Sequence, residues 1–442
     1  MLQAKWSPRV LRSEAVAAQW RTGAGGDAAR PTASRDAGLE RLSAFLPRAA
    51  GYARGRNLVV PPHDRVSGLS PYLRHRLILE AEVIGAVWAA HPPAAVEKFV
   101  AEVLWRTYWK GWLELRPQVW RAYLDQWRRD GDGLDGPAAE RHATAVDGRT
   151  GIDCFDAWVG ELTATGYLHN HARMWFASIW IFTLRLPWTL GAAFFLRHLR
   201  DGDPASNTLS WRWVAGLHTR GKHYLARAEN IARYTEGRFD PRGQLDEQAG
   251  PLTEPELDLR PRPLLECLPP APDGASGLLL TPEDLTPERS PLAGLGFAGI
   301  AGGWDEGVSA AMDLSPAVAS FARESLDDAL ARAAAQLGVP AERLDEAAWL
   351  QSAEDWARGL GVRQVITLET PVGPWAEGIE RLGHRLDPLG IRLVRLRRPW
   401  DSTLWPGATQ GFFRFHEHAL ARSRLASLVA GEGPIQSRSH GG

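Results

Sequence analysis

The stretch DGDPASNTLSWRW places two carboxylates, an amide and two indoles in one short segment. Asp201 and Asp203 flank a glycine, so they either cap a helix and form a turn or accept hydrogen bonds from a bound ligand. Trp211 and Trp213 lie two residues apart and point in different directions on a helix. One indole can therefore face a cofactor while the other faces a substrate.

A second segment, AEVLWRTYW, mixes charged and aromatic residues on one helical stripe. Glu102, Trp105, Arg106 and Trp109 follow the three- and four-residue spacing of a single face. A purely aromatic stripe is usually core. An acid and an arginine are costly in a core unless they are paired, so this mixture favours a lined cavity.

Two further segments carry polar groups. In TGYLHNHARMWFAS, Asn170 and Arg173 share a helical face and offer an amide and a guanidinium to one polar partner. His169 and His171 have no third ligand at metal-binding spacing, so no metal site is predicted. RVSGLSPYLRH, from residue 65 to 75, offers hydroxyls and backbone N–H groups, which form either a phosphate cradle or a plain turn.

The composition and the spacing of apolar residues change along the chain. Residues 1–37 are small and polar, and we expect a flexible segment there. Residues 38–250 show helical spacing of apolar side chains and no β-branched runs, which predicts an all-helical domain. Residues 251–275 are too rich in proline for a helix or a central strand, which predicts a linker.

Residues 276–442 alternate between strands and helices. GLLLTPED, FAGIAGG, VRQVITLETP and IRLVRLRRP are typical of strands, and SFARESLDDALARAAAQLGV and WAEGIERLGHRLDPLG of helices. This alternation predicts a parallel, Rossmann-like α/β domain. GLGFAG, residues 294–299, matches GxGxxG but runs into a strand-like segment, which disfavours a dinucleotide site.

Composition narrows the class of protein. The chain has 442 residues, a formal net charge of −1, 44% hydrophobic and 23% charged residues, and 20 tryptophans. These values are typical of a globular protein with more than one domain. Two cysteines cannot build a disulfide framework, and the start lacks an apolar core of signal-peptide length, so we expect a cytoplasmic protein. Met174 to Leu196 is long enough to span a bilayer, but Arg185 and Pro187 interrupt it, which favours a buried helix pair.

Taken together, SGLSPYL, EVLWRTYW, TGYLHNHARM and DGDPASNTLSWRW resemble the photolyase/cryptochrome family in order and approximate spacing. The likeness covers about residues 39 to 243 and includes ENIARYTEGRFDPRG. It implies an FAD-binding helical domain and blue-light-driven repair of cyclobutane pyrimidine dimers by electron transfer from excited reduced FAD.

The resemblance also assigns residues. For the cofactor it implies Tyr52, Ser67, Leu69, Ser70, Arg106, Asn170, Arg173, Asp201, Asp203 and Asn207. For the substrate pocket it implies Glu102, Trp105, Asn170, Met174 and Trp213. For electron transfer to the flavin it implies Trp211, then Trp188, with Trp127 assigned as the outermost member.

The order of the domains departs from the family, whose members begin with an α/β antenna domain. GATQGFFRFHEHA, residues 407–419, resembles the segment that leads from that domain to the helical one, so we interpret the chain as a circular permutation. A folate or deazaflavin antenna pigment is compatible with this interpretation. The implied partner is DNA containing pyrimidine dimers, with no membrane and no metal, and the expected state is a monomer.

Two other functions stay open. A cryptochrome-like photoreceptor would use the same flavin and tryptophans to signal through a protein partner, and a flavoprotein could have lost its light chemistry. Glu102, Trp105, Asn170 and Trp213 favour repair, because a signalling protein needs no dimer-shaped pocket. A basic rim around the cavity would favour repair further.

Overall fold

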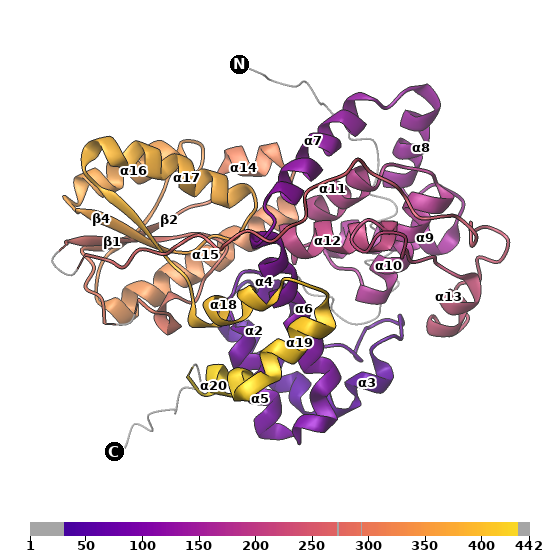
Figure 1. The fold of residues 1–442 in the computed structure, drawn as a ribbon, viewed down its shortest axis with the longest axis horizontal. Helices are drawn as coiled ribbons and strands as arrows, with labels where there is room; N and C mark the ends of the chain where they lie inside the picture. Colours follow the sequence, from indigo (N-terminus) through magenta and orange to yellow (C-terminus); the bar gives the residue numbers. More distant parts are fainter. Residues whose placement is uncertain (1–30, 272–273, 293, 432–442) are drawn as a thin grey trace.

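The computed structural model describes residues 31–271, 274–292 and 294–431, which form a helical unit and a sheet unit (Figure 1). The all-helical and parallel α/β architecture predicted from the sequence is confirmed. The helical unit is built from α2 (Arg35–Phe45), η1 (Leu46–Gly51), α3 (Tyr52–Gly55), α4 (Ser70–Arg74), α5 (Glu80–Ala90), α6 (Pro93–Glu114), α7 (Gln118–Asp132), α8 (Gly136–Val146), α9 (Asp153–Thr165), α10 (Asn170–Ser178), η2 (Ile179–Thr183), α11 (Trp188–His198), α12 (Pro204–Ala215) and α13 (Ala228–Tyr234).

The helices that carry the predicted site residues have clear start and stop signals. α6 has proline at its first position, where the missing N–H costs nothing. Asp203 caps α12 by accepting a hydrogen bond from the Ser206 N–H at 3.2 Å. α9 and α12 end at Gly166 and Gly216, both in the left-handed conformation that glycine adopts without strain.

The sheet unit has five parallel strands in the order β3-β2-β1-β4-β5. Leu278 and Leu280 pack on the face of the sheet covered by α15, and Leu279 packs on the face covered by α16 and α17, as the two-residue period of a strand requires. The elements are β1 (Ser276–Leu280), η3 (Pro287–Arg289), β2 (Gly299–Gly302), α14 (Glu306–Ala311), α15 (Pro316–Leu337), β3 (Ala341–Arg343), α16 (Trp349–Gly359), β4 (Gln364–Leu368), α17 (Pro374–Leu386), η4 (Asp387–Leu389) and β5 (Arg392–Leu396).

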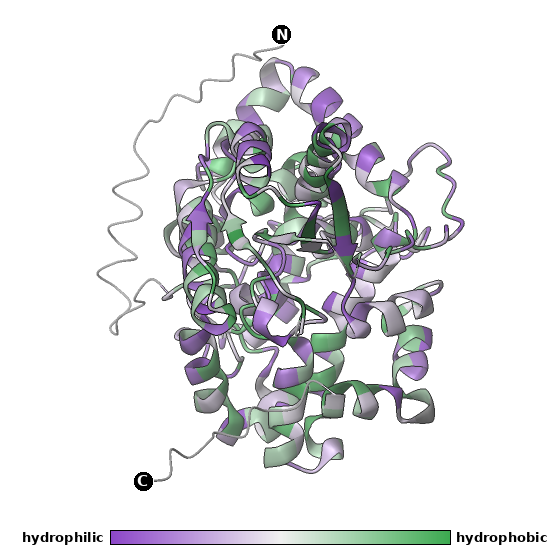
Figure 2. Ribbon diagram, turned by 90° about the vertical axis from the view of Figure 1, so that its left-hand side faces the viewer, coloured by the Kyte–Doolittle hydropathy of each residue, from purple (hydrophilic) through white to green (hydrophobic). Residues whose placement is uncertain are grey.

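The GLGFAG motif leads into β2 rather than connecting a strand to a helix, so its glycines do not form a dinucleotide fingerprint. The stretch from Met174 to Leu196 is broken by η2 and a turn. Among the described residues, no helix is both apolar enough and long enough to span a bilayer. Figure 2 shows hydrophobic colouring on the central strands and on interior helices.

Both ends of the described chain differ from the predicted boundaries. α2 already begins at Arg35, inside the segment expected to be flexible, because Ser34 caps it. At the other end, the chain leaves the sheet unit after β5 and returns to the helical unit (Figure 1). There Trp400 donates a hydrogen bond to Thr107 of α6 at 3.1 Å, and Trp405 packs on Gly111. The returning elements are α18 (Pro399–Leu404), η5 (Trp405–Gly407), α19 (Phe412–Leu420), η6 (Ala421–Ser423) and α20 (Arg424–Gly431).

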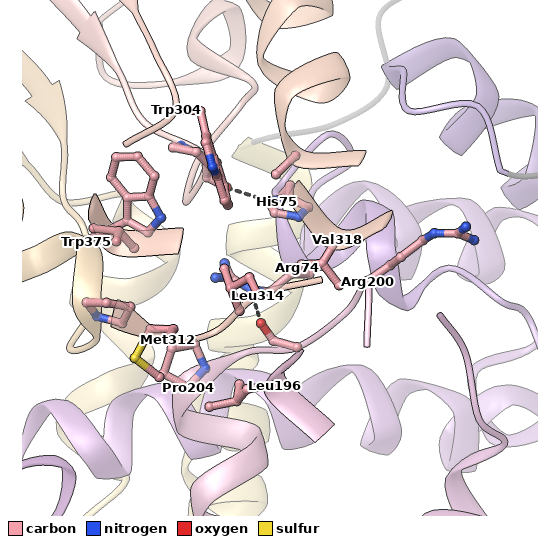
Figure 3. A pocket seen from close by; sticks show the side chains of 15 residues that line it. Arg74, His75, Leu196, Arg200, Pro204, Trp304, Met312, Leu314, Val318 and Trp375 are labelled. Carbon is pink, nitrogen blue, oxygen red and sulfur yellow. Dashed lines mark hydrogen bonds between the residues drawn. The ribbon is translucent and has the colours of Figure 1, made fainter. Parts of the chain in front are cut away.

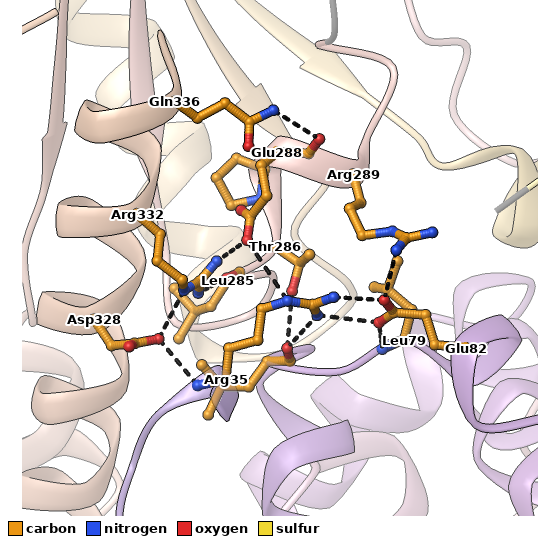
Figure 4. Close-up of polar contacts among 12 residues, drawn as sticks. Arg35, Leu79, Glu82, Leu285, Thr286, Glu288, Arg289, Asp328, Arg332 and Gln336 are labelled. Carbon is orange, nitrogen blue, oxygen red and sulfur yellow. Dashed lines mark hydrogen bonds and ion pairs between the residues drawn. The ribbon is translucent and has the colours of Figure 1, made fainter. Parts of the chain in front are cut away.

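Buried ion pairs join the two units. Arg35 donates to Glu82 at 3.0 Å, and Glu82 also pairs with Arg289 of η3 at 3.1 Å (Figure 4). Arg332 of α15 pairs with Glu288 and with Asp328, whose carboxylate accepts the Arg35 N–H at 3.1 Å. The start of α2 is thus fixed to the sheet unit by charge-assisted hydrogen bonds.

Candidate FAD site and electron-transfer chain

The loop before α4 and the first residue of α4 carry Ser67, Leu69 and Ser70, which were predicted to bind the phosphates of the cofactor. The Leu69 N–H donates to Ser67 Oγ at 3.3 Å, and the Arg41 guanidinium donates to the Ser67 carbonyl at 3.1 Å. Gly68 has a φ of +63°, and a side chain there would collide with Arg41. Arg41 was missed by the sequence prediction, because it lies outside the recognised motifs. Leu69 itself is buried, so it offers the loop only its backbone.

Asp201 and Arg173 form the first charged pair of the site. Arg173 Nη2 lies 2.9 Å from Asp201 Oδ2, and its Nε donates to the Leu168 carbonyl at 2.8 Å. Burial opposes ionisation of Asp201, but Arg173 and a hydrogen bond from Ser70 outweigh it and hold the pKa of Asp201 below its ordinary value. Ser70 thereby connects the phosphate loop to this pair.

Asp203 and Arg106 form the second pair. Asp203 Oδ2 lies 3.6 Å from Arg106 Nη1 and accepts the Ser206 hydroxyl at 2.5 Å. Burial disfavours the Asp203 carboxylate, but Lys110 and Arg106 together bring its pKa down to about 2. The Asn207 amide donates to the Ala192 carbonyl at 2.8 Å, which fixes its side chain on α12.

Several buried polar atoms around these pairs have no hydrogen-bond partner within the described residues. They are Asp201 Oδ1, Arg106 Nη1, Lys110 Nζ and His169 Nε2. An unsatisfied buried polar group costs about 1–3 kcal/mol, so a cluster of them is typical of a site that a polar ligand completes. Carboxylates, guanidinium groups and serine hydroxyls are suitable donors and acceptors for the ribose, flavin edge and phosphates of FAD. The residues present therefore fit this cofactor.

Glu102 lies one helical turn before Arg106 and pairs with Arg56. Burial, partly opposed by Arg56, raises the pKa of Glu102. Tyr52 also hydrogen-bonds Arg56, so the structure places Tyr52 beside Glu102. Arg56 was missed by the sequence prediction, because it lies outside the recognised motifs.

Two partly buried indoles flank this region. Trp105 of α6 stacks on Phe412 of α19, with ring centroids 3.8 Å apart and planes at 7°. Trp213 of α12 stacks on Tyr224 at 5.8 Å. Tyr224 also lines an open cavity of about 360 Å³ with His223, Leu225, Arg227 and Asn230. This volume lies within the range of small-molecule sites.

The remaining predicted pocket residues lie on α10. Met174 is partly buried, while Asn170 is exposed at the first position of the helix. Asn170 is therefore not enclosed with the charged pairs, although it had been predicted for both the cofactor and the substrate. His169 caps the helix, and its ring lies 5.3 Å from His63, which contacts Glu161 at 2.9 Å. No group of three metal-ligating side chains is found in the part of the chain that the structure describes.

Two of the three tryptophans predicted for electron transfer lie beside a tyrosine, whereas the third, Trp211, has other ring partners. Tyr123 lies between Trp188, at 5.6 Å, and Trp127, at 6.5 Å with nearly parallel rings. Tyr123 was missed because only indoles were considered. Trp211 is 2% exposed, and its ring packs against Phe195 at 5.1 Å and Trp180 at 6.3 Å.

The crevice at the carboxyl ends of the strands is the expected ligand position of a doubly wound sheet. Here it holds a cavity of only about 40 Å³, closed by Trp304, Trp375 and Met312 (Figure 3). The loop after β1 contacts the helical unit instead, since His75 Nδ1 lies 2.6 Å from the Pro282 carbonyl. Ligand pockets usually exceed about 300 Å³, so these residues do not fit a folate or deazaflavin.

The fold and the charged cluster define the helical unit as a flavin-binding domain beside a chain of aromatic rings. Residues 99–247, from α6 to beyond α13, match the model of the FAD binding domain of DNA photolyase. Through this helical unit the chain is similar to the photolyase/cryptochrome family.

Several known proteins are similar to this chain. A deoxyribodipyrimidine photo-lyase of Streptomyces griseus is 34% identical over 261 residues, which are 51% of this chain and 54% of the relative. One of Thermus thermophilus is 33% identical over 228 residues, 48% of this chain and 50% of the relative. A bacterial class III photolyase from Agrobacterium tumefaciens, solved as a crystal structure, is 26% identical with a TM-score of 0.39, covering 46% of this chain and 43% of that chain. The chain thus spans about half the length of the curated relatives it matches.

Proposed function

We propose that the protein repairs cyclobutane pyrimidine dimers in DNA under blue light. One observation carries this proposal: α6 and α12 each supply a charged residue to the cofactor site and a partly exposed indole beside it. Arg106 and Trp105 do so on α6, and Asp203 and Trp213 on α12. A protein that only bound FAD would have no use for two partly exposed indoles there.

Bound FAD supplies the light absorption and the electron for repair. The residues named for it are Ser67 and Ser70 for the phosphates, the pairs Arg173–Asp201 and Arg106–Asp203 around its polar groups, and Asn207 on α12. Arg173 lowers the pKa of Asp201, and Lys110 with Arg106 lowers the pKa of Asp203, which keeps both carboxylates ionised as hydrogen-bond acceptors.

The substrate side is built to receive flipped bases. Trp105 and Trp213 offer π-faces on which the dimer stacks, which offsets part of the cost of unstacking it from the duplex. Phe412 holds the Trp105 ring in place from behind. Burial raises the pKa of Glu102, which favours the protonated carboxyl that can donate a hydrogen bond to a pyrimidine carbonyl.

The mouth of this region carries positive charge. Arg56 is about one-third exposed, and Lys98 and Arg227 are exposed near Glu102 and the open cavity, respectively. Such cations suit the phosphates of DNA, and binding should therefore weaken as salt concentration rises.

The test is illumination of the flavin-loaded, reduced protein with dimer-containing single- and double-stranded DNA, with a dark sample as control. We expect dimers to disappear only in the light, and W105A to slow repair while retaining FAD. Dimers that persist under all conditions would overturn the proposal. Persistent dimers together with normal flavin photoreduction would instead support the photoreceptor function.

Two further features stay proposals. The return of α18, α19 and α20 to α5 and α6 supports the circular permutation, because the end of the sheet unit leads directly into the helical unit. The proposed electron-transfer chain of Trp211, Trp188 and Trp127 now includes Tyr123. W211F should slow photoreduction of the flavin while leaving FAD bound. An unchanged rate of photoreduction would exclude this electron-transfer chain.

A further inference from the structure

Trp180, in the π-helical turn η2, is the one tryptophan among the described residues whose ring contacts Trp211. The ring centroids are 6.3 Å apart, and the planes meet at 88°. Trp180 is fully buried, and its Nε1 donates to the Pro187 carbonyl at 2.9 Å. The electron-transfer chain predicted from the sequence does not include Trp180.

Gly191 of α11 allows the two indoles to meet. A Cβ at this position would lie 2.9 Å from Trp180 Nε1 and nearer still to the six-membered ring of Trp211. Real Cβ atoms do not approach other atoms so closely. The contact between Trp180 and Trp211 therefore depends on the missing side chain of Gly191.

Trp188 is placed differently. Its described ring partner is Tyr123, and the guanidinium carbon of Arg212 lies 5.9 Å from its ring centroid. A cation is attracted to a neutral indole, but it repels the positive charge that appears when the indole loses an electron. Glu254 pairs with Arg212 and weakens this repulsion without removing it.

Trp180 has no such cation over its ring in the described part of the chain. Its ring partners other than Trp211 are His142, Phe155, Phe176 and Phe194. Burial lowers the pKa of His142, so this ring is neutral at about pH 7. Nearby cations therefore oppose a positive charge on Trp180 less than they oppose one on Trp188.

We propose that Trp180 is a second electron donor to Trp211, parallel to Trp188. The inference rests on the proposed light-driven flavin function. Once Trp211 has given an electron to the light-excited flavin, one electron passes from Trp180 to Trp211. Trp211 is restored and Trp180 is oxidised by one electron. No bond breaks, and Nε1 keeps its proton, because the Pro187 carbonyl accepts a hydrogen bond but is too weak a base to take the proton.

This branch ends at Trp180. None of its other described ring partners is a tryptophan or tyrosine, so the positive charge returns through Trp211. The branch therefore holds the charge away from the flavin for a time, whereas Trp188, Tyr123 and Trp127 carry it outward. The two branches differ in what they do: one delays recombination and the other completes photoreduction.

The experiment compares W180F, W188F and the double variant as purified, FAD-loaded proteins. Bound flavin per chain is measured first, and a light flash then reports the yield and lifetime of oxidised tryptophan by transient absorption. W188F should retain a long-lived oxidised-tryptophan signal, and adding W180F should reduce that signal at least about tenfold, a coupling that only the double variant reveals. W158F is the matched control, because Trp158 is equally buried and contacts Trp175 instead.

Identical signals in W188F and the double variant would overturn the inference while leaving the proposed function intact. A wild-type protein that binds FAD but shows no oxidised tryptophan would overturn both. G191A in the W188F background is a second route to the same contact, since it should separate the rings and reproduce the loss caused by W180F. If G191A does not fold, the phenylalanine variants alone decide.

Discussion

Buried charges gather in two regions of the molecule, which differ in the geometry of their ion pairs. Where the sheet unit meets the helical unit, Arg398 donates to both Asp284 oxygens at 2.6 and 2.7 Å. Arg74 binds Glu283 in the same two-pronged way, at 2.6 and 2.7 Å. These side chains are less than a tenth exposed, and planar guanidinium–carboxylate pairs of this kind satisfy both partners.

The FAD site has the same residue types and a different outcome. Asp201 and Arg106 each keep one polar atom without a hydrogen-bond partner among the described residues, and so does Lys110. Folding alone therefore leaves polar atoms without partners in this region. At the interface, Arg76 Nε, Glu80 Oε1 and Glu288 Oε2 also lack a hydrogen-bond partner among the described residues, but each of these side chains belongs to an ion pair. Burial of charge is therefore not itself a sign of function, because buried ion pairs also hold the two units together.

The largest expected effect comes from breaking a complete pair. R398M leaves Asp284 with Arg76, at 3.3 Å, and the Thr286 N–H, at 3.5 Å. It should lower the free energy of unfolding by about 3–5 kcal/mol, because a buried charge loses its main partner. Denaturant unfolding of the FAD-free protein measures the change. R260M is the matched control, since Arg260 pairs with Asp258 on the surface and its loss should be undetectable. Equal effects would contradict the distinction between buried and exposed pairs.

Glu114 lies at the interface and accepts the Val372 N–H at 2.5 Å, and it forms no ion pair within the described part of the chain. Burial, only partly opposed by this hydrogen bond, raises the pKa of Glu114 to about 8. An unfolded glutamate ionises near about pH 4.3, so the folded state binds one more proton between that pH and about 8. Stability should therefore fall as pH rises through this window.

E114Q tests this pH dependence, because its amide carbonyl still accepts the Val372 N–H without ionising. The free energy of unfolding of E114Q should rise relative to that of the wild type by about 1–3 kcal/mol between about pH 5 and about pH 9. This value is discounted because Glu114 is only partly buried. Unfolding curves at several pH values measure the difference, in which all other titrating groups cancel. Parallel pH profiles for the two proteins would mean that Glu114 is ionised when folded.

The residues of the candidate site could be predicted from the sequence only in part. The motif residues of the site were predicted because they lie close together on short segments, as with Asp201 and Asp203. Arg41 and Arg56 come from other parts of the chain, and nothing in the local pattern pairs them with Ser67 or Glu102. Side-chain contacts across the fold have no local signature.

The fold shows the same limit. The buried strands β1, β2 and β4 and the partly exposed strand β5 were predicted from the sequence, whereas β3 was missed because its three residues are all exposed at the sheet edge. The return of the last helices to α6 depends on Trp400 and Trp405 finding Thr107 and Gly111. The local pattern shows that these tryptophans are apolar and will be buried, but not against which unit.

A smaller effect is expected where the charge is incompletely paired. R106M removes a guanidinium that lies 3.6 Å from Asp203 and has one unpartnered nitrogen. FAD retention should weaken by roughly tenfold or more, the value of one hydrogen bond to a charged group of about 1.5–3 kcal/mol. Flavin fluorescence released during dialysis measures retention. Retention equal to that of the wild type would place Arg106 outside the cofactor site.

The smallest effect is expected at Lys110, which is 1% exposed and whose ammonium has no hydrogen-bond partner in the described chain. Burial lowers its pKa, and attraction to Asp203 only partly compensates. K110M keeps the length of the side chain and removes the desolvated charge, while Asp203 keeps Ser206 and Arg106. The free energy of unfolding without FAD should therefore stay within about 1 kcal/mol of the wild type, because the lost attraction and the relieved desolvation oppose each other. A loss as large as that of R398M would assign Lys110 to the charges that hold the two units together and not to the FAD site.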